Sequence, residues 1–389
     1  EKHIMKTTDL KRRSSDRFIY IACPWTHLGG GMFKVADYLI QSQTPSAPDG
    51  YARLVPLDTR GGGSALFSFW VLFTALCKLV AGRISGKLAG VHVNMAERLS
   101  IFRKGTIVAA SRLLGIPVIL HLHAAQLHHF YRGLPSPLQA ATRWIFSQAT
   151  HCLVLGNASR EFVTHELQVP ASKIEIVTNG VPAPSLPRRL YNANEPKRIL
   201  FLGNLSERKG VSDLLHAVAT PGFGHNLTVS LAGSGDIPTY QALAEKLGVS
   251  SFVRFEGWAD QAKAAQLIAA ADVLVLPSYD EGLPLVILEA LANSVAVVCT
   301  PVGEIGSTLS DGLNAHFVTP GDIPGIAAGL HKTLYDEQFR ATLESNGRQI
   351  YEARFSMTRF FDSIAAIHKN TFGISAAPGF DQADAGKAK

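Results

Sequence analysis

Two glutamates, Glu281 and Glu289, stand in the stretch DEGLPLVILEAL (280–291), where most of the other residues are apolar. The apolar run DVLVLPS comes directly before this stretch, and Pro284 suits the first turn of a helix. We therefore expect Glu281 in the loop at the carboxyl end of a strand, where doubly wound sheets bind ligands, and Glu289 inside the following helix. Eight helical residues would separate the two by about 12 Å along the axis and by about 80° around it. The two carboxylates therefore cannot flank one bond as a simple catalytic pair.

The residues between the glutamates are suited to binding an anion. Gly282 and Leu283 lead into the helix, where free backbone amides and the helix dipole attract phosphate. Arg208 and Lys209, in the run LFLGNLSERKGVSDLL, likewise follow a strand and precede a helix, and two cations in that position suit a pyrophosphate. No GK[ST] follows a glycine-rich turn, so this is not a P-loop.

Glycines mark the first strand-to-helix turn of the chain. The run THLGGGMFK places Gly30 and Gly31 there, and glycines let a backbone approach a ligand closely. The dinucleotide-binding fingerprint fails, because Lys34 stands where the third glycine should be. We therefore do not expect redox chemistry at this loop.

Histidines cluster in HLHAAQLHH (121–129). No carboxylate completes a familiar ligand set, so we expect no metal. His123 is at the carboxyl end of an expected strand and faces the expected cleft, which makes it a candidate functional residue. His121 is expected to be a buried core histidine.

The elements around these residues repeat twice along the chain. Short apolar strands alternate with helical segments from Arg17 to about residue 185 and again from 198 to 355. Near-continuous apolar strands separated by helices indicate a parallel sheet covered on both faces. We therefore predict an α/β fold of two doubly wound Rossmann-like domains facing a cleft, which is consistent with a length of 389 residues.

The predicted boundaries follow from the same pattern. The first domain covers 14–185, a proline-rich and polar stretch over 186–197 is the linker, and the second domain covers 198–355. Residues 356–371 form a last helix. Residues 372–389 are expected to be a mobile tail.

Charge and cysteine content bear on partners and compartment. Residues 1–190 hold 22 Lys and Arg against 10 Asp and Glu, while residues 191–389 hold 15 against 21. The basic half suggests an anionic partner such as lipid headgroups, a pyrophosphate or nucleic acid, or else a basic solvated surface with no partner. The four cysteines are far apart and form no CxxC pair, which fits a reducing cytoplasm.

The segment ALFSFWVLFTALC (65–77) is uncharged and aromatic. Spanning a bilayer takes about 20 apolar residues, so the segment is expected to be either a core helix or a helix lying in the membrane interface. The sequence leaves both alternatives open.

Taken together, these motifs resemble the retaining sugar-nucleotide glycosyltransferases of the GT-B fold, specifically family 4, over about residues 17–370. The spacing of the two glutamates in EGLPLVILE is the most specific element of the resemblance. It is accompanied by GG, HLHA, TNGV, RKG, LAGSG and TPVG, and by a closing segment like the family's last helix, which crosses back to the first domain. The run VGEIGSTL departs from the family's usual GGIPEVI.

The resemblance implies a role for each matching residue. Glu289 would hold the ribose hydroxyls of the donor nucleotide, and Glu281 would lie against the transferred sugar as a positioning or electrostatic group. Lys209 would neutralise the diphosphate, to which Arg208 is a further candidate ligand. Backbone amides at Gly30 and Gly31 would approach the same group. His123 would touch the sugar or its phosphate.

The resemblance thus implies a retaining, metal-independent hexosyltransferase that needs no cofactor besides its nucleoside-diphosphate sugar donor. We expect a glycan or polyprenyl-linked acceptor in surface polysaccharide biosynthesis, no nucleic-acid partner, and a cytoplasmic enzyme peripheral to the inner face of the plasma membrane. The alternatives are a sugar-nucleotide epimerase or hydrolase on the same fold and a binding module without catalysis. Nucleotide base, sugar and acceptor stay undetermined.

Overall fold

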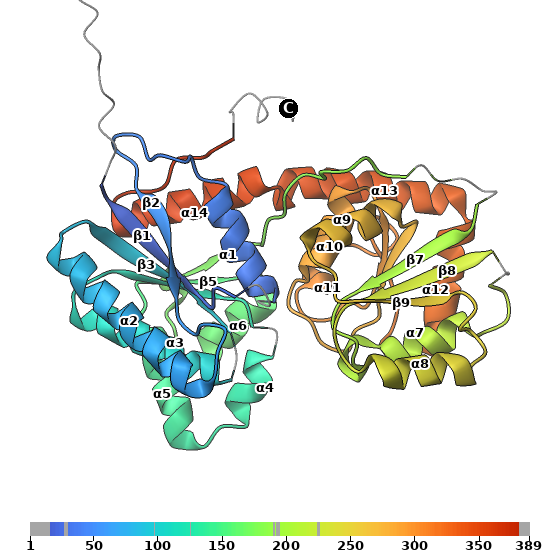
Figure 1. The fold of residues 1–389 in the computed structure, drawn as a ribbon, viewed down its shortest axis with the longest axis horizontal. Coiled ribbons are helices and arrows are strands. Elements are labelled where there is room, and N and C mark those ends of the chain that lie inside the picture. The colour runs from blue at the N-terminus through green and yellow to red at the C-terminus, as the bar shows by residue number, and fades with distance from the viewer. Residues whose placement is uncertain are drawn as a thin grey trace, which may run out of the picture.

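The computed structural model describes residues 16–26, 30–96, 98–124, 126–189, 191, 195–223 and 226–380. Within them the chain forms two six-stranded parallel sheets, each flanked by helices, one in each half of the molecule (Figure 1). The predicted fold of two doubly wound α/β domains is confirmed.

The first sheet has the strand order β2-β1-β3-β4-β5-β6. Alternate residues of β1 enter two different hydrophobic clusters: Ile19 and Ile21 belong to one, and Tyr20 and Ala22 to the other. Both faces of this strand are therefore buried, which explains why its sequence is apolar without alternation. The strands are β1 (Phe18–Cys23), β2 (Arg53–Asp58), β3 (Leu88–Met95), β4 (Val118–Leu122), β5 (His151–Val154) and β6 (Ile174–Ile176).

Helices cover both faces of this sheet. They are α1 (Gly31–Gln41), α2 (Ala65–Ile84), α3 (Leu99–Leu113), α4 (Leu127–Arg132), α5 (Ser136–Ser147), α6 (Asn157–His165) and the 3-10 turn η1 (Ala171–Lys173). The sequence analysis missed β2. This strand contains Pro56, which demotes a strand pattern, and it lies at the sheet edge, where a proline is tolerated.

The second sheet has the order β12-β11-β10-β7-β8-β9. Its strands are β7 (Lys197–Leu202), β8 (Leu227–Ala232), β9 (Val253–Gly257), β10 (Val273–Leu276), β11 (Ala296–Cys299) and β12 (His316–Phe317). Its helices are η2 (Glu207–Lys209), α7 (Val211–Val218), α8 (Ile237–Lys246), α9 (Gln261–Ala270), α10 (Leu285–Ala292), α11 (Ile305–Thr308), α12 (Ile323–Tyr335), α13 (Glu337–Ile350) and η3 (Tyr351–Phe355). β10 is central, so the loop between it and α10 opens at the middle of the sheet.

The last helix, α14 (Met357–Phe372), leaves the second half of the molecule and packs on the first (Figure 1). Its Phe372 lies so close to β3 that a Cβ at Gly90 would be 2.2 Å from the phenyl ring. Because glycine has no Cβ, the helix can lie directly on the strand.

The prediction of a mobile tail from residue 372 is wrong for the described part. Phe372 is the last residue of α14, and the backbone after it bonds to the first domain. Ala52 N donates to Ser375 O at 2.9 Å, and Thr44 N donates to Ala377 O at 3.0 Å. These contacts bury Ile374 and Ala376, which a tail would expose. Residues 381–389 lie outside the described residues.

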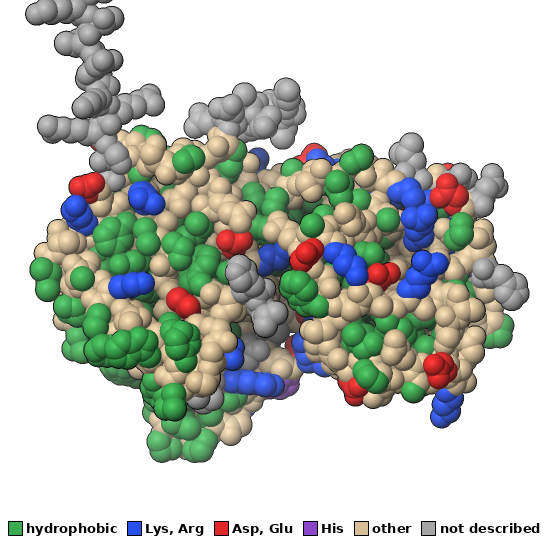
Figure 2. Space-filling model, viewed as in Figure 1, with side chains coloured by type: hydrophobic (Ala, Val, Ile, Leu, Met, Phe, Trp, Pro, Cys, Tyr) green, Lys and Arg blue, Asp and Glu red, His purple; other side chains and the backbone are tan. Residues whose placement is uncertain are grey.

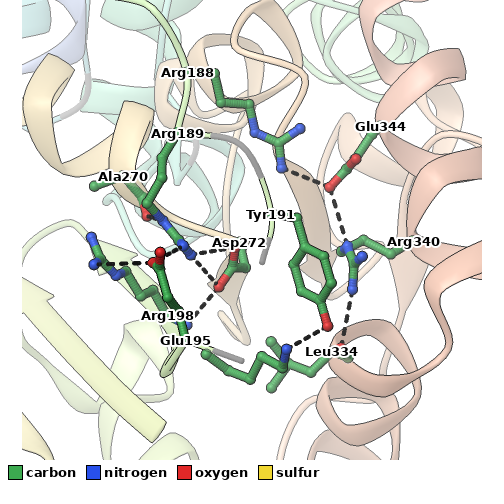
Figure 3. A network of polar contacts seen from close by, with 11 residues as sticks. Arg188, Arg189, Tyr191, Glu195, Arg198, Ala270, Asp272, Leu334, Arg340 and Glu344 are labelled. Carbon is green, nitrogen blue, oxygen red and sulfur yellow. Dashed lines mark hydrogen bonds and ion pairs between the residues drawn. The ribbon is translucent and has the colours of Figure 1, made fainter. Parts of the chain in front are cut away.

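The predicted linker, 186–197, is held against the second domain by charged side chains (Figure 3). Arg189 Nη2 donates to both carboxylate oxygens of Asp272, at 2.7 and 2.8 Å, and Asp272 is 1% exposed. Arg188 Nη2 donates to Glu344 Oε1 at 2.6 Å. The described part of this segment is therefore fixed to the second domain.

Segment 65–77 begins α2, and its aromatic side chains do not lie in the core. Leu66, Phe69 and Trp70 are 82%, 72% and 63% exposed, whereas Ala75 and Leu79 are buried against the domain. The core-helix alternative is therefore wrong for most of this helix. The hydrophobic side chains that gather on this part of the surface are visible in Figure 2.

Candidate active site

Glu281 lies in the loop between β10 and α10 and is 6% exposed. Lys209, 72 residues earlier and at the end of η2, the turn that follows β7, forms an ion pair with its Oε1. The next residue, Gly210, has φ 70°, and a Cβ there would lie 2.2 Å from the carbonyl oxygen of Pro277. Glycine permits this approach of the two loops, because other residues rarely adopt this φ and would clash. Lys209 therefore reaches Glu281 as its buried counter-ion.

Arg208 fixes the backbone of the same loop. Its Nη1 donates to the carbonyl oxygen of Asp280 at 2.6 Å, and Tyr279 N donates to Arg208 O at 2.9 Å. Across the cleft, Gln126 Nε2 donates to Asp280 Oδ2 at 3.0 Å. Arg208 therefore braces the loop that carries Glu281 and lines the adjacent cavity.

Glu289 projects from α10 toward the first domain. Its Oε1 forms an ion pair with Lys34 and accepts from Tyr38 OH at 3.3 Å. Both partners come from α1, the helix that follows the glycine turn. The helix position of Glu289 is as predicted, and its contacts to the first domain were not foreseen.

His123 follows β4 and is held by Asn94 at the end of β3. Asn94 Nδ2 donates to Ala22 O at 3.5 Å, which leaves Oδ1 as the acceptor for His123 Nε2, at 2.9 Å. His123 Nδ1 is thus the unprotonated nitrogen, and it is buried without a partner among the described residues. Burial, reinforced by nearby His92 and Lys104, lowers the pKa of His123 to about 3. The imidazole is therefore neutral at physiological pH.

His121 belongs to a chain of buried histidines behind His123. His92 Nε2 bonds His121 Nδ1 at 3.2 Å, and His92 Nδ1 bonds His368 Nε2 of α14 at 2.9 Å. Burial lowers the pKa of all three side chains. Within the described residues, no group of three or more His, Cys, Asp or Glu is arranged to hold a metal ion. His121 is the buried core histidine that was expected.

One cavity of about 390 Å³ gathers the predicted residues from both domains. Gly30, the N-cap of α1, is not among the residues that line it. The predicted residues that do line it are Gly31, His123, Arg208, Lys209, Glu281, Gly282, Leu283 and Glu289. Of these predicted residues, the second domain supplies the carboxylates and the cations Arg208 and Lys209, and the first domain supplies the histidine; the first domain also adds Lys34 to the lining.

A larger cavity of about 640 Å³ adjoins the first and shares Leu155, Glu281 and Gly282 with it. Its wall contains another contact between the domains, because the carboxylate of Glu304 accepts from Ser159 N at 2.8 Å and from Ser159 Oγ at 2.7 Å. Glu304 is 1% exposed and neutralises the amino terminus of α6. It lies in the run VGEIGSTL, whose sequence departs from the family pattern.

Sequence reasoning missed several residues that build this site. Lys34, Tyr38 and Asn94 hold the predicted Glu289 and His123, and the buried Asn179 lines the smaller cavity. One available signal was the spacing of Lys34 and Tyr38, four residues apart, which places them on one face of the helix after the glycines.

Two facing doubly wound domains with a cavity between the carboxyl ends of their sheets define the GT-B class of glycosyltransferases. The HepE protein of Anabaena, solved in complex with UDP and glucose, has this architecture. It superposes with a TM-score of 0.72 at 17% identity over 90% of this chain and 99% of that one. At this identity the likeness concerns the fold.

Two family models match adjacent parts of the sequence: Glycosyltransferase Family 4 over residues 96–183 and Glycosyl transferases group 1 over residues 185–350. The chain belongs to this family of glycosyltransferases, as its motifs predict.

The relatives with curated names match parts of the chain. An uncharacterized glycosyltransferase of Methanocaldococcus jannaschii is 27% identical over 59% of this chain and 61% of its own length. The lipopolysaccharide core biosynthesis glycosyltransferase LpsE of Rhizobium meliloti is 34% identical over 43% of this chain and 48% of its own. The matched segments thus span about half to three fifths of these relatives.

Proposed function

We propose that this protein transfers a hexosyl group from a nucleoside-diphosphate sugar to a hydroxyl group of a glycan or a polyprenyl-linked acceptor, with retention of anomeric configuration. One observation carries the proposal. Glu281, Lys209 and Glu289 from the second domain and His123 from the first converge on a single cavity. The complex of HepE with UDP and glucose supports a nucleotide-sugar donor for a protein of this fold.

The donor is proposed to lie along α10. Its ribose meets Glu289, its diphosphate lies over the start of the helix near Gly282 and Leu283, and its sugar meets Glu281 and His123. Arg208, Lys209 and the backbone amides supply positive charge where the leaving diphosphate gains negative charge in the transition state. Fixed cations can thus take the role of a metal ion, which is why we propose metal-independent transfer.

The proposed transfer needs no covalent intermediate between the enzyme and the sugar. The bond from the anomeric carbon to the diphosphate oxygen breaks, and a bond from the same carbon to the acceptor oxygen forms on the same face. The acceptor proton passes to the departing phosphate. In this proposal Glu281, paired with Lys209, acts as an electrostatic group beside the sugar, and neutral His123 accepts a hydrogen bond through Nδ1.

The larger cavity is the proposed acceptor site, because it meets the donor cavity at Glu281 and Gly282. Its wall mixes Asp280, Arg132, Tyr279 and Ser159, a set of donors and acceptors suited to a polyhydroxyl ligand. The name of the LpsE relative supports a role in surface polysaccharide synthesis.

We further propose that the protein is cytoplasmic and binds the inner face of the plasma membrane through α2. Leu66–Ile84 is the stretch of the described residues that is long and apolar enough to cross a bilayer, and 17% of it is buried. Since α2 packs on β2, β3 and α3, it is part of the domain, and its other face is free to lie in the interface.

Charge favours a bilayer as the partner of this face. Between Asp58 and Glu161 the sequence contains one acidic residue, Glu97, and eleven Lys and Arg, of which Lys104 is buried. Lys78 and Arg83 of α2 itself are exposed. Each such cation near an anionic leaflet contributes about 1 kcal/mol, and burial of a large apolar side chain contributes about 1.5–3 kcal/mol.

The test of the proposed reaction is a nucleotide-sugar panel. A nucleoside diphosphate that binds the folded protein raises its melting temperature, which identifies the base. The matching sugar nucleotides are then incubated with and without a lipid-linked oligosaccharide acceptor. Transfer that depends on the acceptor supports the proposal, whereas complete conversion to an epimer or to free sugar without acceptor would favour the epimerase or hydrolase alternative.

A further inference from the structure

The two carboxylate oxygens of Glu289 have different surroundings. Oε1 is bound by Lys34 Nζ and by Tyr38 OH at 3.3 Å. Among the described residues, no hydrogen bond or ion pair reaches Oε2. The side chain of Glu289 is 12% exposed, so this oxygen has limited access to water. One oxygen is thus held by the protein and the other is available to a ligand.

The holding groups are themselves fixed in place. Lys34 and Tyr38 are four residues apart on α1 and therefore lie on one face of the helix. Tyr38 is 4% exposed, and burial together with the neighbouring Glu289 carboxylate raises the pKa of its phenol. The phenol consequently keeps its proton and donates it to Oε1.

The Lys34–Glu289 ion pair also lies where two cavities meet. Both residues line the donor cavity of about 390 Å³ and a second cavity of about 380 Å³. The second cavity is bounded by Tyr38, by residues 182–186 and by α9. A ligand that extends along α10 therefore passes this ion pair.

We propose that Lys34 and Tyr38 are positioning residues for the ribose of the donor. By occupying Oε1 they turn Oε2 toward the cavity, where it accepts hydrogen bonds from the ribose hydroxyls. The inference rests on the proposed function, which places the ribose at Glu289. It adds that the first domain, through α1, takes part in recognising the nucleotide bound mainly by the second.

The inference predicts a specific loss of ribose recognition. The probe pair is the nucleoside diphosphate that raises the melting temperature most and its 2′-deoxy form, both titrated calorimetrically. A hydrogen bond to a charged group is worth about 1.5–3 kcal/mol, so the parent protein should prefer the ribonucleotide by about 10-fold or more. Lys34→Met should reduce this preference to about 2-fold by releasing the carboxylate, and Tyr38→Phe should reduce it less.

Control variants distinguish a lost orientation of Glu289 from a general loss of folding or binding. Lys34→Arg keeps the positive charge and a hydrogen-bond donor, so it should keep most of the preference for the ribonucleotide. Lys246 is an exposed lysine of α8, and Lys246→Met should leave that preference unchanged. If Lys34→Met bound the 2′-deoxy form as the parent does and kept the full ribose preference, the inference would be overturned and the proposed function would stand. If Glu289→Gln also kept the preference, the ribose would not lie at Glu289 and the proposed donor site itself would be wrong.

Discussion

At the scale of single residues, each of the two carboxylates of the site, Glu281 and Glu289, is paired with a lysine. Lys209 and Glu281 are 13% and 7% exposed at their side chains, so each depends on the other for compensation of its charge. Glu289 is likewise paired with Lys34, from the other domain. The proposed donor would thus enter a cavity whose charged groups are already oriented.

We expect Lys209→Met to impair both stability and transfer. Removing one partner of a buried ion pair leaves the other uncompensated, which destabilises by roughly 3 kcal/mol. The loss of a cation beside the leaving diphosphate should lower kcat by about 100-fold or more. Urea unfolding and initial rates measure the two effects, with Lys246→Met as the matched control. A Lys209→Met protein that transfers sugar at the parent rate would show that Lys209 is misassigned.

The sequence predicted the neighbourhood of Glu281 and Lys209 because both follow apolar strands of one parallel sheet, whose carboxyl ends share an edge. Lys34 and Asn94 could not be found in this way. Lys34 acts across the cleft, so its role depends on how the two domains pack. Asn94 acts through a hydrogen bond to His123 that strand patterns do not encode.

At the scale of elements, α2 and the linker segment have surroundings that their composition alone did not reveal. An apolar run looks the same whether it is covered by protein or by lipid, so segment 65–77 stayed undecided until its exposure was known. The proline-rich segment 186–197 lacks periodicity, yet its arginines attach it to the second domain. In both cases the tertiary contacts, and not the composition, determine whether the segment is exposed or attached to a domain.

Replacing Phe69 and Trp70 by Ser should weaken binding to anionic vesicles by about 10-fold or more, because two large apolar side chains leave the interface. Co-sedimentation with phosphatidylglycerol vesicles measures the effect. The matched control replaces two exposed apolar residues of the second domain, Leu313 and Tyr335, by Ser. Equal binding of both double variants, or no binding by the parent protein, would rule out α2 as the membrane-binding face.

Arg189→Ala should destabilise the second domain by about 3 kcal/mol, because Asp272 would lose its charged partner while it stays buried. Denaturant unfolding of Arg189→Ala beside Arg359→Ala, a variant of a last-helix arginine that forms no ion pair among the described residues, gives the comparison. Equal stability of the two variants would mean that the linker network in Figure 3 contributes little.

At the scale of the whole molecule, the last part of the described chain returns to the first domain. α14 returns from the second half to the first, and residues after it bond to the first domain. The return of the last helix was implied by the family resemblance. The docking of residues 374–380 was not predictable, since it rests on backbone hydrogen bonds, which composition does not specify.

The buried histidines make the stability of the folded protein depend on pH. The pKa values of His92 and His123 fall to about 3 in the folded protein, from an ordinary value near 6.5. The unfolded chain therefore binds protons below about pH 6.5 that the folded chain does not, and stability is full above that pH and is lost as the pH falls toward 3. Each histidine contributes at most about 1.4 kcal/mol per pH unit.

Urea midpoints at about pH 7.5 and about pH 5.5 test this dependence, since most carboxylates stay ionised over that interval. We expect a clear fall in the free energy of unfolding at the lower pH, and a smaller fall in His92→Gln, which cannot titrate. A midpoint that does not change with pH in the parent protein would contradict the assignment of neutral buried histidines.

The central claim is glycosyl transfer with retention from a nucleotide sugar bound at the Glu281–Glu289 cavity. The measurement that tests it most directly is the proton NMR spectrum of the product formed from an α-linked sugar nucleotide and a lipid-linked oligosaccharide acceptor. The account predicts a new glycosidic anomeric signal with the α configuration, absent when Glu281→Gln replaces the parent. A β-linked product, or an α-linked product formed equally by Glu281→Gln, would contradict it.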